Sequence, residues 1–400
     1  MRIGYTLYAM KKRKKKAPIK REHLRRLRLS KGYSLGDLAN AMGNIVTRQA
    51  LFRYEDGSVN PSRKVEERLA EALGVKKSQL WRKAEHDISC VYRGYRRTAR
   101  IPVKEKTRVQ EFVAQKFTAY IRLQAWICPE EERTISLPRF SLSTIEDAET
   151  AAMTLRKQWD LGIGPIANVV ALLESKNIFV IDIDADKRFD GLAVFAYGMK
   201  KKPIAAAVVN RTNTCGERQR LSLLHELGHL ILDIPKGMDK ELAAFRFGAA
   251  FLAPAVEVIS RVGENRSLIR GEELLLLKRY FGMSVQALLY RLHHLKIINQ
   301  ACFTRWYTEI SALGWKRTEP FEMPPEQGWW FYRKLMKCLS EGVVTMKEIE
   351  EILDEVLSEE EKALFINRTS YLRMTPSRRR KYVHDNLSLL APNGSLFFPS

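Results

Sequence analysis

Cysteine is scarce in this chain, with five among 400 residues, and the five are widely spaced with no C-x-x-C pair. An odd, dispersed set argues against a disulfide framework or a cysteine-based zinc site, and it fits a reducing cytoplasm. Long hydrophobic runs are missing too, since no stretch reaches the roughly 18 residues of a membrane-spanning helix. The apolar patch at residues 3–10 precedes its basic run, the reverse of a secretory signal. We therefore expect a cytoplasmic protein with no membrane partner.

Acidic residues are nearly absent from the N-terminus. Glu22 is the only acid in residues 1–32, whereas Lys11–Lys16 form an unbroken basic run. The whole chain carries a net charge of +22, with a pI of about 9.8. Such an excess points to a polyanionic partner, either nucleic acid or an anionic membrane. A basic run is equally typical of a solvated, disordered tail, so both interpretations of the arm stay open.

Internal repeats are also missing, and composition divides the chain into five segments. Residues 1–20 form a basic arm, and residues 21–80 are predicted to be a compact helical unit. Residues 81–144 form a basic, helical connector. Residues 145–300 alternate helical and strand patterns, whereas residues 301–400 are mostly helical with a polar tail.

Hydrophobic periodicity predicts the elements around the centre of the chain. In the connector we expect an amphipathic helix at 109–127 and a linker at 136–143. The segment after it combines helices with strands, which predicts an α+β unit. Its expected helices are 145–160, 165–175, 218–232 and 240–252, and its expected strands are 177–184, 191–197 and 204–210.

The strongest chemical signal is the run His225-Glu226-Leu227-Gly228-His229. Residues four apart lie on the same face of a helix, so His225 and His229 can bind one metal ion. Glu226 lies about 100° round the helix from His225, beside the place of a metal-bound water. Zn²⁺ lowers the pKa of such a water to about 7, and a carboxylate can take its proton. The alternative is a surface helix with a fortuitous histidine pair.

A catalytic zinc ion usually has three protein ligands and one open position. The residues themselves leave four acids open as the third ligand: Asp233, Asp239, Glu241 and Glu257. Arg291, His293 and His294 are also within possible reach, although nothing local places them at the site. We expect these three to be structural or surface residues.

The run Glu241-x-x-Ala244-Phe245-x-Phe247-Gly248-x-x-Phe251-Leu252-x-Pro254 resembles the segment that follows H-E-x-x-H in the ImmA/IrrE metallopeptidases. Segments 189–191, 204–210 and 286–292 resemble the same family, so the resemblance covers roughly residues 145–300. It implies that Glu241 is the third ligand. Phe245 departs from the family, which usually has Asn at this position.

Residues 21–80 resemble the Xre/Cro-type helix-turn-helix family. Ser34 and Asp37 form the pattern of a capping box before a helix at 35–42, and Thr47 caps a helix at 48–54. In such folds the start of the third helix reaches base edges in the major groove. The residues expected to contact an operator in double-stranded DNA are Thr47, Arg48, Gln49, Phe52 and Arg53. A protein-docking module that no longer binds DNA is the alternative.

Together the resemblances imply a multidomain fold class. An all-α helix-turn-helix bundle would precede an α+β zincin-like metallopeptidase domain and a helical C-terminal extension. The default role of the extension is packing, with a sensor or a dimerisation surface as the alternatives. The implied function is a Zn²⁺-dependent endopeptidase in which Glu226 activates water to cleave a protein, often a transcriptional repressor. The resemblances imply a bacterial or phage-encoded protein that is associated with the nucleoid. A homodimer is one oligomeric state that they suggest. The alternative is a non-proteolytic regulator or antitoxin whose zinc domain senses a ligand or holds shape.

Overall fold

The computed structural model describes residues 22–81, 89–93, 101–127, 135–197, 203–345, 347–350 and 353. The expectations for the basic arm and for the polar tail lie outside these residues. Contacts divide the chain into two compact units, which are described separately. The first holds Met1–Asp87, Arg97–Val113 and Ala185–Phe189, and the second holds the rest.

The first unit contains a four-helix bundle formed by short, capped helices. Ser34 accepts from the Asp37 N–H and Asp37 accepts from the Ser34 N–H, which is the predicted capping box. A buried ion pair between Arg28 and Glu55 links the first helix to the third. Leucines fill the centre of the bundle. The helices are α1 (Glu22–Ser30), α2 (Leu35–Ala41), α3 (Arg48–Glu55) and α4 (Arg63–Leu73), followed by the 3₁₀ turn η1 (Lys77–Gln79).

The second unit is built on a mixed four-stranded sheet with the order β1-β4-β5-β3. β4 is antiparallel to both of its neighbours, whereas β3 and β5 are parallel. The strands predicted from periodicity are confirmed to within one residue at each end. The bounds are β1 (Ser89–Arg93), β3 (Ile178–Ile183), β4 (Gly191–Tyr197) and β5 (Pro203–Arg211).

Three parts of the connector differ from expectation. β1 was not predicted, because five residues with a basic end carry little periodic signal and depend on β4 for their hydrogen bonds. The expected linker contains β2 (Phe140–Ser141), which pairs in parallel with β6 (Leu232–Asp233). Helix α5 (Val103–Ile127) also begins six residues before the predicted start.

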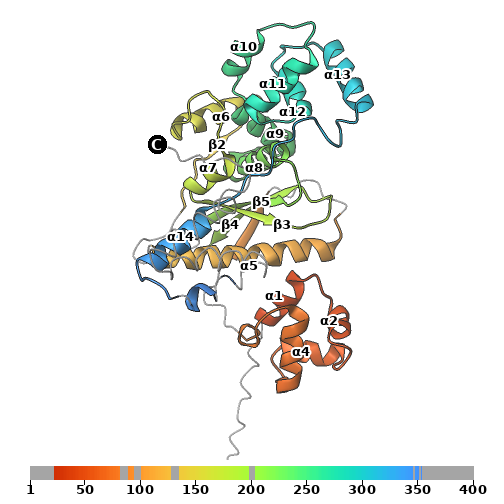
Figure 1. The fold of residues 1–400 in the computed structure, drawn as a ribbon, viewed down its shortest axis with the longest axis vertical. Helices are drawn as coiled ribbons and strands as arrows, with labels where there is room; N and C mark the ends of the chain where they lie inside the picture. The colour runs from red at the N-terminus through yellow and green to blue at the C-terminus, as the bar shows by residue number, and fades with distance from the viewer. Residues whose placement is uncertain are drawn as a thin grey trace, which may run out of the picture. The chain divides into compact units, whose positions relative to one another are not determined.

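Helices cover both faces of this sheet (Figure 1). The part of α5 from Ala114 onward lies on one face, where Tyr120 stacks on Phe179 of β3 with ring centroids 4.9 Å apart. The other face carries α6 (Asp147–Gln158), α7 (Val169–Ser175), α8 (Gly216–Ile231) and α9 (Lys240–Leu252). Helix α7 begins four residues later than predicted, because Asn168 caps it and Pro165 and Ile166 lie in the preceding loop.

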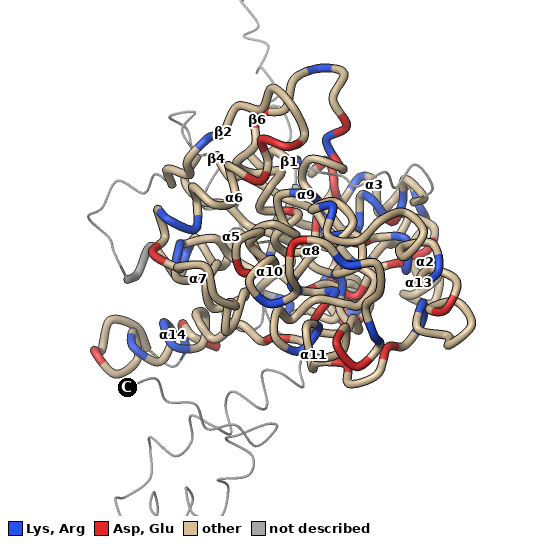
Figure 2. Tube along the Cα trace, turned by 90° about the horizontal axis from the view of Figure 1, so that it is seen from above, with Lys and Arg blue, Asp and Glu red and all other residues tan. Residues whose placement is uncertain are grey.

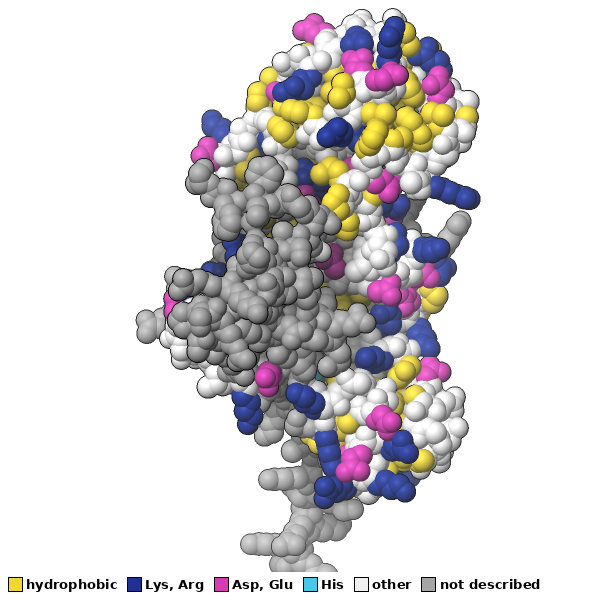
Figure 3. All heavy atoms as spheres, viewed as in Figure 1, with side chains coloured by type: hydrophobic (Ala, Val, Ile, Leu, Met, Phe, Trp, Pro, Cys, Tyr) yellow, Lys and Arg dark blue, Asp and Glu magenta, His cyan; other side chains and the backbone are white. Residues whose placement is uncertain are grey.

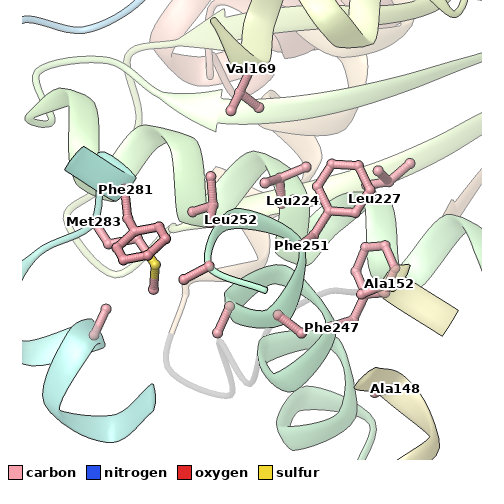
Figure 4. Close-up of a cluster of buried hydrophobic side chains, with 14 of the residues drawn as sticks. Ala148, Ala152, Val169, Leu224, Leu227, Phe247, Phe251, Leu252, Phe281 and Met283 are labelled. Carbon is pink, nitrogen blue, oxygen red and sulfur yellow. The ribbon is translucent and has the colours of Figure 1, made fainter. Parts of the chain in front are cut away.

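One hydrophobic cluster joins the upper face of the sheet to these helices (Figure 4). Phe247 and Phe251 of α9 lie beside Leu224 and Leu227 of α8. The ring centroids of the two phenylalanines are 5.6 Å apart. Burying such side chains stabilises a fold by about 1.5–3 kcal/mol each. Helix α8, which carries His225 and His229, is therefore a central core element.

Five more named helices follow in the described part of the second unit, and residues 347–350 are also helical. The five are α10 (Ala255–Val262), α11 (Gly271–Phe281), α12 (Val285–His294), α13 (Gln300–Ala312) and α14 (Trp330–Ser340). Hydrophobic side chains are exposed over the upper part of the molecule on the face seen in Figure 3. Val256 of α10 and Leu276 of α11 are among the exposed large hydrophobic residues. Charges of both signs lie along single helices (Figure 2), and α11 begins with acids and ends with bases. Among the described residues, no single helix is long and apolar enough to cross a membrane; α9 and α10 pass this test only as a pair, bent by 59°.

Candidate metal centre

Glycines allow helices α8 and α9 to pack closely. A Cβ atom at Gly228 would lie 3.2 Å from the Ala244 Cα, and a Cβ atom at Gly248 would lie 3.2 Å from the His225 N. Both distances are tighter than ordinary van der Waals contact. A larger residue at either position would push the two helices apart. This close packing holds the first turn of α9 beside the histidines of α8.

The approach of the two helices brings three side chains together. The Nε2 atoms of His225 and His229 are 3.1 Å apart. The Glu241 carboxylate lies 3.2 Å from the His225 Nε2 and 3.4 Å from the His229 Nε2. Their ligand atoms all lie within 4.8 Å of one another. Both imidazoles are buried, whereas the Glu241 side chain is 29% exposed, so the cluster is open on the side of α9.

Glu226 is buried against the start of β4, a central strand of the sheet. Its side chain lies so close to Gly191, the first residue of β4, that a Cβ atom there would be 2.7 Å from the Glu226 Oε1. The residue is only 1% exposed, although it follows directly after His225 in α8. Glycine at the start of β4 is therefore required for the position of this acid.

The histidines shape the electrostatics of Glu241. Burial by itself would raise the pKa of the carboxyl group, but hydrogen bonds with His225 and His229 outweigh burial and lower its pKa to about 2. The group is therefore ionised at neutral pH. An ionised carboxylate beside two imidazoles is a donor set suited to a divalent cation.

The other three acids considered from sequence are engaged elsewhere. Asp233 forms an ion pair with Arg139. Asp239 caps α9 by accepting from the N–H groups of Glu241 and Leu242. Glu257 accepts hydrogen bonds from Arg261 and Tyr280. Among the described residues, His225, His229 and Glu241 make up the single group of three or more His, Cys, Asp or Glu able to hold a metal.

Three basic residues near the end of the predicted 145–300 segment, Arg291, His293 and His294, have structural surroundings. Arg291 is fully buried and donates to the Ala253 carbonyl and to the Glu149 carboxylate. His293 packs against Phe303, with ring centroids 4.8 Å apart. Burial lowers the pKa of His294, and the nearby Arg246 lowers it further. None of the three belongs to the metal cluster.

The five residues expected to contact DNA are exposed around the start of α3. Thr47 caps the helix by accepting from the Ala50 N–H. Arg48, Gln49 and Arg53 are exposed, and Phe52 keeps 56% of its surface in solvent. The opposite side of α3 is buried in the bundle through Leu51, Tyr54 and Glu55. An exposed phenylalanine between two arginines is suited to apolar contact with a thymine methyl group.

Two family models match this chain. Residues 24–80 match the helix-turn-helix model, and residues 208–293 match the model of the IrrE N-terminal-like domain, a peptidase family. The chain joins a helix-turn-helix domain to an IrrE-like domain. The order of the two domains along the chain is the one implied by the resemblances. The metal cluster lies inside the matched IrrE-like segment. No curated protein matches the chain.

A cavity of about 520 Å³ beside His225 was not expected from the sequence. Arg218, Leu221, Ser222 and His225 of α8 line it. Ser222, Leu221 and Arg218 precede His225 by three, four and seven residues, so all four lie on one face of the helix. This spacing could have been seen in the sequence. The remaining walls come from segments far apart in the chain, which no local pattern connects.

Proposed function

We propose that this chain is a DNA-binding zinc metallo-endopeptidase that cleaves a regulatory protein, specifically a transcriptional repressor. The observation that carries the proposal is the cluster of His225, His229 and Glu241, whose ligand atoms lie within 4.8 Å of one another. The matched IrrE-like segment supports a metallopeptidase. The exposed α3 face and the helix-turn-helix match support an operator in double-stranded DNA as the second partner.

The donor set fits zinc. Two imidazole nitrogens and one carboxylate are a common ligand set of catalytic zinc, and the exposed edge of Glu241 leaves an approach for a substrate. His225, His229 and Glu241 would hold the ion. When bound, zinc supplies Lewis acidity that polarises a peptide carbonyl and acidifies water.

Glu226 carries the proton transfer in this proposal. Its carboxylate removes a proton from the attacking water, whose hydroxyl adds to the peptide carbonyl carbon. Glu226 then delivers the proton to the leaving amine nitrogen as the C–N bond breaks. Burial against Gly191 holds the carboxylate in one place, so it need not be reoriented for each turnover.

We expect purified protein to hold one zinc ion per chain, and Glu241→Ala to lower zinc affinity at least about tenfold. The reason is that removal of one of three ligands leaves an incomplete coordination shell. Zinc content after dialysis against a graded chelator series measures the effect. Glu257→Ala is the matched control, since Glu257 bonds to Arg261 and Tyr280 and should leave zinc binding unchanged. Equal zinc content in the two variants would exclude Glu241 as a ligand.

The start of α3 provides a test of DNA recognition. We expect Gln49→Ala to weaken binding to a selected operator by about 1–3 kcal/mol and to relax base preference at one position, because Gln reads adenine through two hydrogen bonds. Operator selection followed by titration at fixed salt measures both effects. Glu71→Gln, at an exposed site on α4, is the control. An unchanged affinity and preference would count against this face as the DNA reader.

The whole proposal is tested by incubating the zinc-loaded protein with a repressor encoded beside it. We expect cleavage at a defined peptide bond, and no cleavage after chelation. Occupancy of an operator that responds to zinc, with every candidate repressor left intact, would instead support a non-proteolytic regulator.

A further inference from the structure

The segment 315–326, which we call the strap, follows α13 and lies against the start of α8. The Gly216 N–H donates to the Met323 carbonyl at 2.7 Å, and the Met323 N–H donates to the Glu217 carboxylate at 3.0 Å. A Cβ atom at Gly216 would lie 2.4 Å from the Pro324 carbonyl oxygen. Glycine at this position therefore allows the strap to touch the backbone of the helix that carries the metal-cluster histidines.

Two buried carboxylates fix the strap, one within it at Glu319 and one at its end at Glu326. Glu319 accepts from the Lys278 ammonium at 3.0 Å and from the Val285 N–H at the start of α12 at 2.9 Å. Glu326 forms a buried ion pair with Arg220 and accepts from the Val169 N–H at 2.7 Å. Each glutamate therefore satisfies a helix N-terminus as well as a buried cation. These contacts make the strap a fixed wall, although it lies outside the matched IrrE-like segment.

The wall bounds the cavity at His225. The strap contributes residues 315–319 and Glu322 to the lining, while α8 contributes His225 itself and α12 contributes Tyr290. The volume of about 520 Å³ lies in the range of small-ligand pockets and accommodates several side chains of a peptide. The cavity therefore borders the metal cluster at one of its three residues, His225, and the strap completes its wall.

The charges around this cavity are mostly positive. Arg211, Lys316 and Arg317 line it, and none of them forms an ion pair with a carboxylate of the described residues. Two other lining cations are already neutralised, Arg218 by Asp190 and Lys278 by two glutamates.

Few negative charges oppose these cations. The charge of Glu319 is taken up by Lys278 and by the start of α12, and Glu322 is the one lining acid at the exposed edge. Lys316 also lies over the Tyr307 ring, with its Nζ 4.9 Å from the ring centroid. Cations that have no carboxylate partner in a partly enclosed pocket favour an anionic side chain.

We propose that the strap completes a substrate pocket beside His225 that takes an acidic side chain, Asp or Glu, next to the scissile bond. The proposal rests on the proposed function and adds a substrate class to it. Lys316 and Arg317 are the specificity-determining residues from the strap, and Arg211 at the end of β5 faces the same pocket. Peptides with Lys or Arg at this position are rejected by repulsion between like charges.

The test uses peptide hydroxamates, which bind zinc without being cleaved, in two series that extend to either side of the hydroxamate. Each series carries Glu, Gln or Lys at the residue next to the zinc-binding group. In calorimetric titration of the zinc-loaded full chain, we expect the Glu compound of one series to bind about five- to twentyfold more tightly than its Gln partner. The double variant Lys316→Glu/Arg317→Glu should remove this preference and favour Lys.

The double variant Lys157→Glu/Lys347→Glu is the control, because it changes net charge equally at exposed sites away from the cavity. It should keep the preference for Glu. Equal binding of the Glu and Gln compounds in both series would overturn the acidic pocket and leave the peptidase proposal standing. A preference that survives in Lys316→Glu/Arg317→Glu would overturn the role of the strap. Failure of the wild-type chain to hold zinc would overturn the proposed function, and the pocket with it.

Discussion

Glu226→Gln is expected to lower peptide hydrolysis by about 10²–10⁴-fold while zinc stays bound. The amide keeps the size of the carboxylate, so it still fits the narrow space against Gly191. It cannot accept the proton of the attacking water, and general-base catalysis of this kind accounts for a factor of that size. The measurement is the initial rate of repressor cleavage, with the zinc content of the same sample determined in parallel.

Glu272→Gln is the matched control for this prediction. Glu272 is an exposed acid in the first turn of α11, and its loss should leave the rate unchanged. Cleavage at the wild-type rate by Glu226→Gln would remove this residue from the mechanism. Loss of zinc from Glu226→Gln would place Glu226 in metal binding instead of proton transfer.

Glu326→Leu is expected to lower the free energy of unfolding by about 3–5 kcal/mol. The substitution leaves the Arg220 guanidinium buried, with side-chain exposure of 2%, and without its carboxylate partner. A buried charge without a partner destabilises the fold, because it has lost its hydration. The Ile166 carbonyl would still accept a hydrogen bond from Arg220, but one carbonyl replaces the lost water only in part. Urea unfolding followed by tryptophan fluorescence measures the change.

Glu309→Ala provides the comparison on the surface of the same unit. Glu309 pairs with Arg305 one turn away, and both side chains are about half exposed, so the loss should be at most about 0.5 kcal/mol. If Glu326→Leu cost less than about 1 kcal/mol, the strap would not be fastened by this ion pair. The strap would then not be a rigid wall of the pocket.

Long periodic segments made the centre of the fold predictable. The predicted bounds of β4 and α9 coincide with those in the structure, because an unbroken apolar run and a capped apolar helix are both local signals. The short strands were missed, because β1, β2 and β6 exist only through pairing with distant partners. The start of α7 was placed too early, because its cap at Asn168 gives a weaker signal than the apolar residues before it.

The candidate site shows the same division between local and distant information. His225, Glu226 and His229 follow from a five-residue run, since helical geometry alone puts the two imidazoles on one face. Spacing left four acids open as the third ligand, and the resemblance implied Glu241. Its assignment as a ligand stays a prediction, whereas its place beside both histidines is a fact of the packing between α8 and α9.

The sequence by itself determined the two domain types, their order and the histidine pair. Each domain type and the histidine pair depend on residues that lie close together in the chain. Only the tertiary structure decided which acid faces the histidines and how the strap closes the cavity. Those outcomes depend on glycines that let helices and strap approach and on buried ion pairs such as that of Arg220 with Glu326. Contacts between different elements, such as those of the strap with α8 across more than a hundred positions, leave no periodic trace in the sequence.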